Sequence, residues 1–253
     1  MLEQFLTYNI FGFFLIFARV GTTFLMLPGI SAGYVPRWVR LAIALGVCIV
    51  VAPILVPIMP VPPAAASALV LLILGEFLVG AFMGGLARVA VGALQTAGTI
   101  ISLLSSLANS LVQDAVSEQQ SSIISSFLTT VGILLIFVTN LHHLTIEALI
   151  ESYAVFVPAT RIEIGDMALM LARHVTESFA LGLQITAPTL VVGICYYVGL
   201  GVFGRLMPAL PVFFFAMPAQ IALQFGILMI VLSTMMMVFM RHYQDVYTPF
   251  LAP

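Results

Sequence analysis

Charged side chains are scarce in this chain, and lysine is missing altogether. Eight arginines and ten acidic residues make up 7% of its 253 residues, whereas about 25% of the residues in an average soluble domain are charged. So few charges cannot cover the surface of a soluble enzyme of this size. The net charge of −2 provides no basic patch, so we expect no nucleic-acid partner.

Groups that carry out chemistry are equally few. His142 and His143 are adjacent and therefore point in different directions on a helix, while the other two histidines stand alone and both cysteines lie inside apolar runs. The chain has neither a glycine-rich phosphate loop with its lysine nor a serine nucleophile elbow. We therefore predict no catalytic residues, no metal and no cofactor, and expect that the protein is not an enzyme.

Long hydrophobic runs are what the chain has instead, since 62% of its residues are apolar. A helix of about 20 apolar residues crosses a bilayer, whereas membrane β-barrels need shorter, alternating strands. We predict an all-α integral membrane protein, organised as a single domain over residues 1–253 with a charged linker at 158–173. Its seven hydrophobic segments are 5–27, 41–59, 66–87, 90–112, 123–141, 178–203 and 209–240.

The ends of these segments suggest a topology. Seven crossings with the N-terminus outside leave only Arg205 on the outer side and six arginines on the inner side, as the positive-inside bias favours. The first segment lacks a basic leader, so we expect it to be mature structure and not a signal peptide. Asp166 is expected to cap a helix that starts at Met167. Broken or kinked helices are expected at the prolines of three segments, which are Pro53, Pro57, Pro188, Pro208, Pro211 and Pro218.

Two charges and two glycines recur every fourth residue in the third segment. Glu76, Gly80, Gly84 and Arg88 share one helical face, and a small-xxx-small pattern lets helix backbones approach closely. Helix packing and a transported-ion site both fit this pattern. The two charges are too far apart to pair with each other, so each should meet a partner on another helix or subunit.

A stripe of uncharged polar residues follows. If 90–112 continues as a single helix, residues spaced by three or four share one face, and a wall that touches water is one explanation. Hydrogen bonding between helices is the other. Leu103, Leu107 and Leu111 could exclude ions from such a pore in its closed state. The stripe itself consists of Gln95, Thr99, Ser102, Ser106, Asn109 and Gln113.

The stripe leads into a polar tip. Asp114, Glu118, Gln119 and Gln120 form the most polar stretch outside the 158–173 linker, and polar residues continue a short way into the following segment. We interpret residues 90–141 as a hairpin with polar walls and a hydrophilic tip. An ordinary exposed loop would look the same over 114–122 alone, so the flanking stripes carry the functional interpretation.

Short motifs occur along nearly the whole chain. They are Phe17–Arg19 with Pro28 and Pro36, Gly75–Glu76 with Gly80 and Gly84, Gln95–Gly98, Asn140–His142, Ala187–Pro188, and Arg205, Pro208 and Phe213 with Pro218. Each motif is short, but their order and spacing together are specific, and they resemble the FliR family of flagellar type III export gate proteins and its injectisome counterparts. The chain departs from the family at Ala209, Pro211 and Leu141, and it lacks the family's Asp-Pro in the loop at 114–122.

The resemblance implies a structural subunit in the bacterial inner membrane, within the flagellar basal body. Proteins similar to this one join about five copies of FliP and about four of FliQ in a helical ring through which unfolded flagellar proteins leave the cytoplasm. FlhB and FlhA are further expected partners. The family member supplies a loop that plugs the closed pore, and the tip described above falls on that loop. Because the ring rises above the membrane plane, several segments would face sister subunits instead of lipid.

Two other functions remain open at this point. An injectisome subunit would share the same chemistry as a flagellar one. A secondary transporter or ion channel could use Glu76, Asp114, His142 or Glu147 as an ion relay between broken helices. Against a transporter, the chain has no inverted repeat, and most of its acidic residues lie near predicted segment ends.

Overall fold

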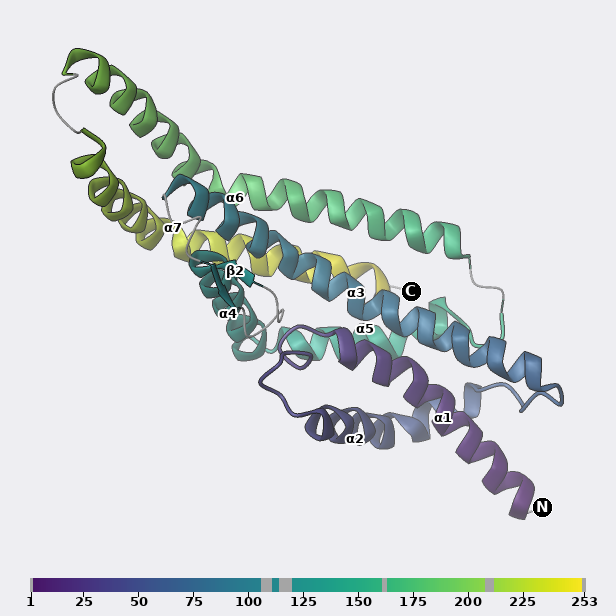
Figure 1. Ribbon diagram of the computed structural model, residues 1–253. Helices are drawn as coiled ribbons and strands as arrows, with labels where there is room; N and C mark the ends of the chain where they lie inside the picture. The colour runs from purple at the N-terminus through teal and green to yellow at the C-terminus, as the bar shows by residue number, and fades with distance from the viewer. Residues whose placement is uncertain (1, 106–110, 114–119, 161–162, 208–211, 252–253) are drawn as a thin grey trace. The chain divides into compact units, whose positions relative to one another are not determined.

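The fold is almost entirely helical, as expected (Figure 1). A computed structural model of the chain describes residues 2–105, 111–113, 120–160, 163–207 and 212–251. The described elements are α1 (Leu2–Met26), α2 (Arg37–Leu55), the 3₁₀ turn η1 (Val56–Ile58), α3 (Ala66–Leu104), β1 (Leu111–Gln113), β2 (Gln120–Ser122), α4 (Ile123–Val138), α5 (Leu141–Val155), α6 (Ile164–Leu206) and α7 (Val212–Leu251).

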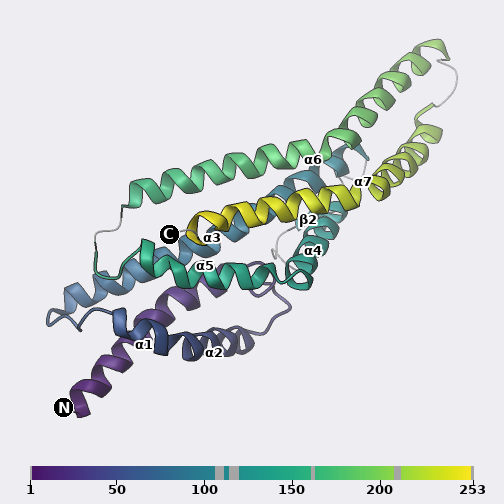
Figure 2. The same ribbon diagram turned by 180° about the vertical axis from the view of Figure 1, so that it is seen from behind.

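The chain divides into two compact units, and its three longest helices contribute to both. The first unit comprises Met1–Ala90, Thr139–Val175 and Gln244–Pro253. It contains α1, α2, α5 and the first part of α3, which lie alongside one another in both views (Figures 1 and 2). Tyr247 is fully buried and donates a hydrogen bond to the carbonyl of Met83 at 3.0 Å. The Phe82 ring forms T-shaped contacts with the rings of Phe156 and Phe250.

The second unit comprises Val91–Val138 and Thr176–Tyr243. Here glycines let helices approach closely, because a Cβ at Gly98 would lie 2.3 Å from the Cα of Ser125 on α4. Side-chain amides on α7 also reach backbone carbonyls: Gln220 donates to Leu104 on α3, and Gln224 donates to Thr189 on α6 at 3.3 Å. Polar side chains therefore connect apolar helices in this unit, as they do in membrane bundles.

The described helices do not coincide with the seven expected segments, because two of these segments merge into one helix and α5 corresponds to none of them. Segments 66–87 and 90–112 were expected to be separate, but one helix of 39 residues, α3, runs through Arg88. A single arginine is a good helix former and needs only an outlet to water, so it marks no helix end. Among the described residues, four helices are long and apolar enough to cross a membrane, or five if α4 and α5 form one broken span.

The end of α3 also differs from expectation. We expected a helix to 112, but α3 ends at Leu104, and residues 111–113 form a strand that pairs antiparallel with 120–122. The hydroxyls of Ser102 and Ser105 bond back to the carbonyls of Gly98 and Ile101. Serine and asparagine, which are frequent in the next residues, favour such local bonds over continued helix.

Prolines interrupt the helices less than expected. Pro57 lies in η1, directly after α2, but Pro53, Pro188 and Pro218 lie inside α2, α6 and α7. Proline removes one helical hydrogen bond and bends a helix without ending it, and the ribbon of α6 changes direction part-way along its length (Figure 1). Pro208 and Pro211 lie outside the described residues.

The expected cap at Asp166 was also wrong. Helix α6 begins at Ile164, so Asp166 lies in its first turn and not before it. The carboxylate still meets the positive end of the helix dipole there, which stabilises the helix start. Asp166 does lie near the start of the helix, but the predicted start at Met167 is three positions too late.

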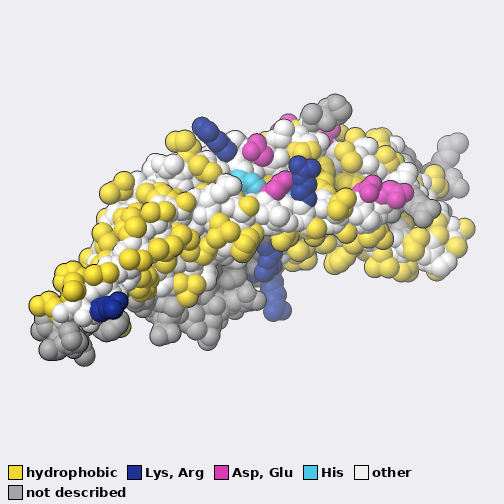
Figure 3. Space-filling model, turned by 90° about the horizontal axis from the view of Figure 1, so that it is seen from above, with side chains coloured by type: hydrophobic (Ala, Val, Ile, Leu, Met, Phe, Trp, Pro, Cys, Tyr) yellow, Lys and Arg dark blue, Asp and Glu magenta, His cyan; other side chains and the backbone are white. Residues whose placement is uncertain are grey.

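Apolar side chains dominate the outer surface. The face in Figure 3 is mostly hydrophobic, with few and scattered charges. Large apolar residues are exposed in both units, among them Val61 at 77% and Ile230 at 81%. Such a surface needs lipid or other protein around it, which confirms the prediction of an integral membrane protein.

Candidate functional site

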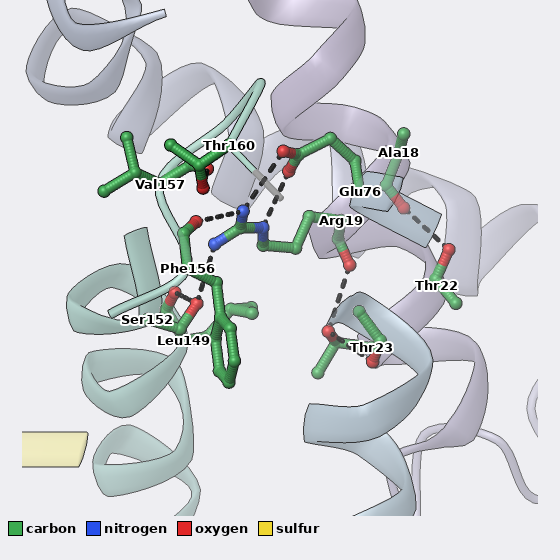
Figure 4. Close-up of polar contacts among 11 residues, drawn as sticks. Ala18, Arg19, Thr22, Thr23, Glu76, Leu149, Ser152, Phe156, Val157 and Thr160 are labelled. Atoms are coloured by element: carbon green, nitrogen blue, oxygen red, sulfur yellow. Dashed lines mark hydrogen bonds and ion pairs between the residues drawn. The ribbon is translucent and has the colours of Figure 1, made fainter. Parts of the chain in front are cut away.

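The most structured polar site is a buried ion pair between α1 and α3 (Figure 4). Arg19 is 1% exposed and Glu76 is 3% exposed. The Arg19 Nε donates to Glu76 Oε2 at 2.7 Å, and its Nη2 donates to Oε1 at 3.1 Å. Both carboxylate oxygens are thus engaged by one guanidinium, in the two-pronged geometry that makes such pairs strong.

Helix α5 and the turn after it complete the site. Arg19 Nη1 donates to the Ser152 hydroxyl at 3.1 Å, and Nη2 donates to the carbonyl of Phe156 at 2.8 Å. The guanidinium carbon also lies 3.7 Å from the ring centre of Tyr153, a cation–π contact. One buried side chain therefore joins α1, α3 and α5.

This arrangement compensates charge and fixes geometry. All three guanidinium nitrogens have acceptors, and the carboxylate has its cation, so the pair can stay in an apolar interior. A transported ion would need the carboxylate oxygens that Arg19 already holds. The geometry therefore argues against an ion relay through Glu76. It supports a structural role, in which the ion pair connects three helices.

The two glycines on the Glu76 face of α3 also pack against α1. A Cβ at Gly80 would lie 2.3 Å from the Arg19 carbonyl oxygen, and one at Gly84 would lie 2.8 Å from the Met26 Cβ. Both glycines thus let α3 touch the backbone of α1. Arg88, the fourth residue of the expected face, is exposed.

The expected polar stripe is only partly helical. Gln95 is half-buried and Thr99 is exposed, but Ser102 is 1% exposed and donates to the Gly98 carbonyl. Because Gln113 is not in α3, the stripe does not continue to its last residue on one helix. Ser106 and Asn109 lie outside the described residues, and Gln113 is in strand β1.

The expected closure and tip residues are also divided. Leu103 is 59% exposed at the end of α3, and Leu111 lies in β1. Gln120 lies in β2, where it pairs with Gln113 across the hairpin. The remaining residues of these two sets, Leu107, Asp114, Glu118 and Gln119, lie outside the described residues.

The residues named through the family motifs have different surroundings. Arg19 is the centre of the buried cluster, whereas Arg205 is exposed near the end of α6. Phe213 lies in the first turn of α7, and Pro208 lies outside the described residues. Within the described part of the chain, no group of histidine, cysteine or acidic residues is arranged to hold a metal ion.

Three members of the buried cluster were not anticipated. Ser152, Tyr153 and Phe156 bear no recognisable motif, and their segment was not among the seven hydrophobic ones. The available signal was the arginine itself: a guanidinium inside an apolar run needs acceptors. That signal predicts a carboxylate partner but cannot say which backbone carbonyl or hydroxyl completes the set.

Comparison with known proteins gives a consistent result. Residues 10–246 match the model of the family described as bacterial export proteins, family 1. The flagellar biosynthetic protein FliR of Caulobacter vibrioides is 34% identical over 232 residues, covering 91% of this chain and 92% of that protein. The protein of the same name in Bacillus subtilis is 27% identical, covering 90% of this chain and 88% of its own length.

Proposed function

Because the chain belongs to family 1 of the bacterial export proteins, we propose that it is a structural, non-enzymatic subunit of the flagellar protein export apparatus. The observation that carries this proposal is the end-to-end likeness to the Caulobacter FliR protein, which leaves little of either chain unmatched. The flagellar names of the relatives favour this role over an injectisome role.

The proposed location is the inner membrane, within the flagellar basal body. Four long apolar helices support a membrane location. The proposed partners are FliP and FliQ, with FlhB and FlhA, in an assembly that conducts unfolded flagellar proteins. The exposed apolar side chains in both units support such partners, because sister subunits and lipid could cover them.

We further propose that the segment from Ser105 to Ser122 closes the conduit. Its described residues include two antiparallel strands, which bring Gln113 and Gln120 opposite each other. Exposed Leu103 at its base could exclude ions. We therefore propose the closure at the paired strands 111–113 and 120–122, in place of a polar stripe on one continuous helix.

Native mass spectrometry of the assembly purified through this chain tests the proposal. One copy of this 27.2 kDa chain should occur with several copies of two other small membrane proteins, and deletion of its gene should abolish motility until the gene is restored. A small oligomer of this chain alone would favour a transporter and contradict the proposal. Recovery with a needle-type secretion system and normal motility would favour the injectisome.

A further inference from the structure

A cleft of about 450 Å³ lies between α1, α2 and α3 within the first unit. This volume falls in the range of roughly 300–1,000 Å³ that small-molecule sites occupy. The walls are almost entirely apolar and rich in phenylalanine. The main contributors are Phe14, Phe17 and Phe24 from α1, Leu41 from α2 and Phe77 from α3.

Two arginines are the charged residues of this cleft, and no acidic residue is among its described lining residues. Arg37 is exposed, and Arg40 is half-buried. Arg40 donates to the carbonyls of Val35 at 3.1 Å and Ala32 at 2.6 Å, which fixes its guanidinium without neutralising it. Arg19 differs, because its guanidinium is paired with the carboxylate of Glu76.

We propose that this cleft binds one anionic phospholipid, with an acyl chain between α1, α2 and α3 and the phosphate on Arg37 and Arg40. Guanidinium groups match phosphate oxygens in charge and geometry, and basic pockets between membrane helices bind anionic headgroups. An apolar protein segment would fit the walls but would leave the two positive charges without a counterion.

The aromatic residues beside the arginines agree with this occupant. Tyr34 is 61% exposed and Trp38 is 73% exposed, and both lie within three positions of Arg37. Exposed tyrosine and tryptophan side chains settle at the headgroup level of a bilayer. The arginines would then lie at the depth of the lipid phosphates, with the apolar cleft extending from them.

The chain carries its own probe for this site, because Trp38 is its single tryptophan. The assembled complex is reconstituted in phosphatidylcholine vesicles that contain a small fraction of brominated lipid, either phosphatidylglycerol or phosphatidylcholine. The Trp38 signal is the difference between the native complex and one with Trp38→Phe. Quenching should favour brominated phosphatidylglycerol by roughly tenfold, since each arginine near a membrane surface contributes to anionic lipid binding.

Matched variants separate the two parts of the site. Arg37→Gln with Arg40→Gln should abolish the preference and the double lysine variant should retain most of it, while Arg88→Gln, an exposed arginine outside the cleft, should leave it unchanged. Gly21 lines the cleft, and a Cβ there would lie at an ordinary contact distance of 3.5 Å from the Phe17 ring. Gly21→Leu should therefore fill the cleft and weaken quenching by both lipids. Gly46→Leu, which faces open space, is the control.

Three outcomes would overturn the proposal. The first is equal quenching by the two brominated lipids in the native complex. The second is a preference that survives the double glutamine variant. The third is no quenching by either lipid, which would mean that a protein segment covers the cleft. Because quenching is measured as the fraction of the Trp38 signal that is lost, a lower yield of a variant does not obscure it, and none of these results bears on the export role.

Discussion

Arg19 connects three helices of the first unit. Its charge is compensated by a carboxylate, a hydroxyl, a carbonyl and an aromatic ring that come from other helices and a turn. Removing one partner of a buried pair leaves the other charge uncompensated, at a cost of about 3–5 kcal/mol. Exchanging both for apolar residues of similar size avoids that cost.

We therefore expect Arg19→Met alone and Glu76→Gln alone to lower the yield and thermal stability of the purified complex strongly. The double variant Arg19→Met with Glu76→Met should recover much of the loss, because no isolated charge remains. The measurement is the midpoint of thermal unfolding in mild detergent, with exposed Arg88→Gln as control. A double variant as unstable as the worse single variant would contradict this account.

A second residue-scale prediction concerns two glycines on α3. Gly80→Ala would place a Cβ 2.3 Å from a backbone oxygen of α1, whereas Gly85→Ala meets nothing within 4 Å. The first change should force the helices apart and lower the free energy of unfolding by about 1–3 kcal/mol, as overpacking of a core does. The second should be neutral or stabilising by up to ~1 kcal/mol, since alanine favours helix over glycine. Equal effects on complex yield would refute the packing argument.

Asn140 provides a third test, at the start of α5. Its φ of 60° places it in the left-handed region, which asparagine and glycine adopt readily and other residues adopt at a cost of about 1–2 kcal/mol. Asn140→Gly should therefore be tolerated, and Asn140→Val should lower the unfolding midpoint. If valine were as stable as glycine at this position, the turn would not require the left-handed conformation.

At the scale of elements, the last turns of α3 test the proposed closure. Single cysteines at Thr99 and Leu103, in a background without Cys48 and Cys195, should react with a water-soluble thiol reagent when substrate is stalled in the channel. A cysteine at Ser102, which is 1% exposed, should stay unreactive. Uniform reactivity at all three positions would contradict the placement of this helix end.

Shortening the same hairpin tests its role directly. Deleting part of 112–121 should leave the complex assembled, since the described contacts between α3 and α4 at Gly98 and Ser125 lie outside the deletion. The membrane should then leak small ions, measured as ion flux from vesicles. A complex that assembles and remains tight would show that another element closes the conduit.

The sequence predicts membrane helices better than it predicts which distant residues pair. Long apolar runs indicate membrane helices because length and hydrophobicity are local properties, and the spacing of Glu76, Gly80 and Gly84 indicates a packing face for the same reason. One acceptor of Arg19, the Phe156 carbonyl, lies in a turn 137 residues further along the chain. No local sequence pattern contains both residues. The expected helix was wrong at residues 111–113, which form a strand, because polar residues kept a helical spacing in a part of the sequence where helix propensity is low.

At the scale of the whole molecule, the exposed apolar side chains predict dependence on partners. Expressed without FliP and FliQ, the chain should be degraded or aggregate, and co-expression should raise its yield many-fold, measured by quantitative blotting of the membrane fraction. A monodisperse and thermally robust monomer in mild detergent would count against the proposed assembly.

The buried pair also has a consequence for biosynthesis. Arg19 and Glu76 are separated by 57 residues, and ribosomes add about 5–20 residues per second. For roughly 3–11 s the nascent helix α1 carries an unpaired guanidinium that apolar surroundings disfavour. Arg19 can therefore be buried only after α3 has been made, so the pairing of α1 with α3, and not the synthesis of α1, sets the time at which α1 reaches its final position.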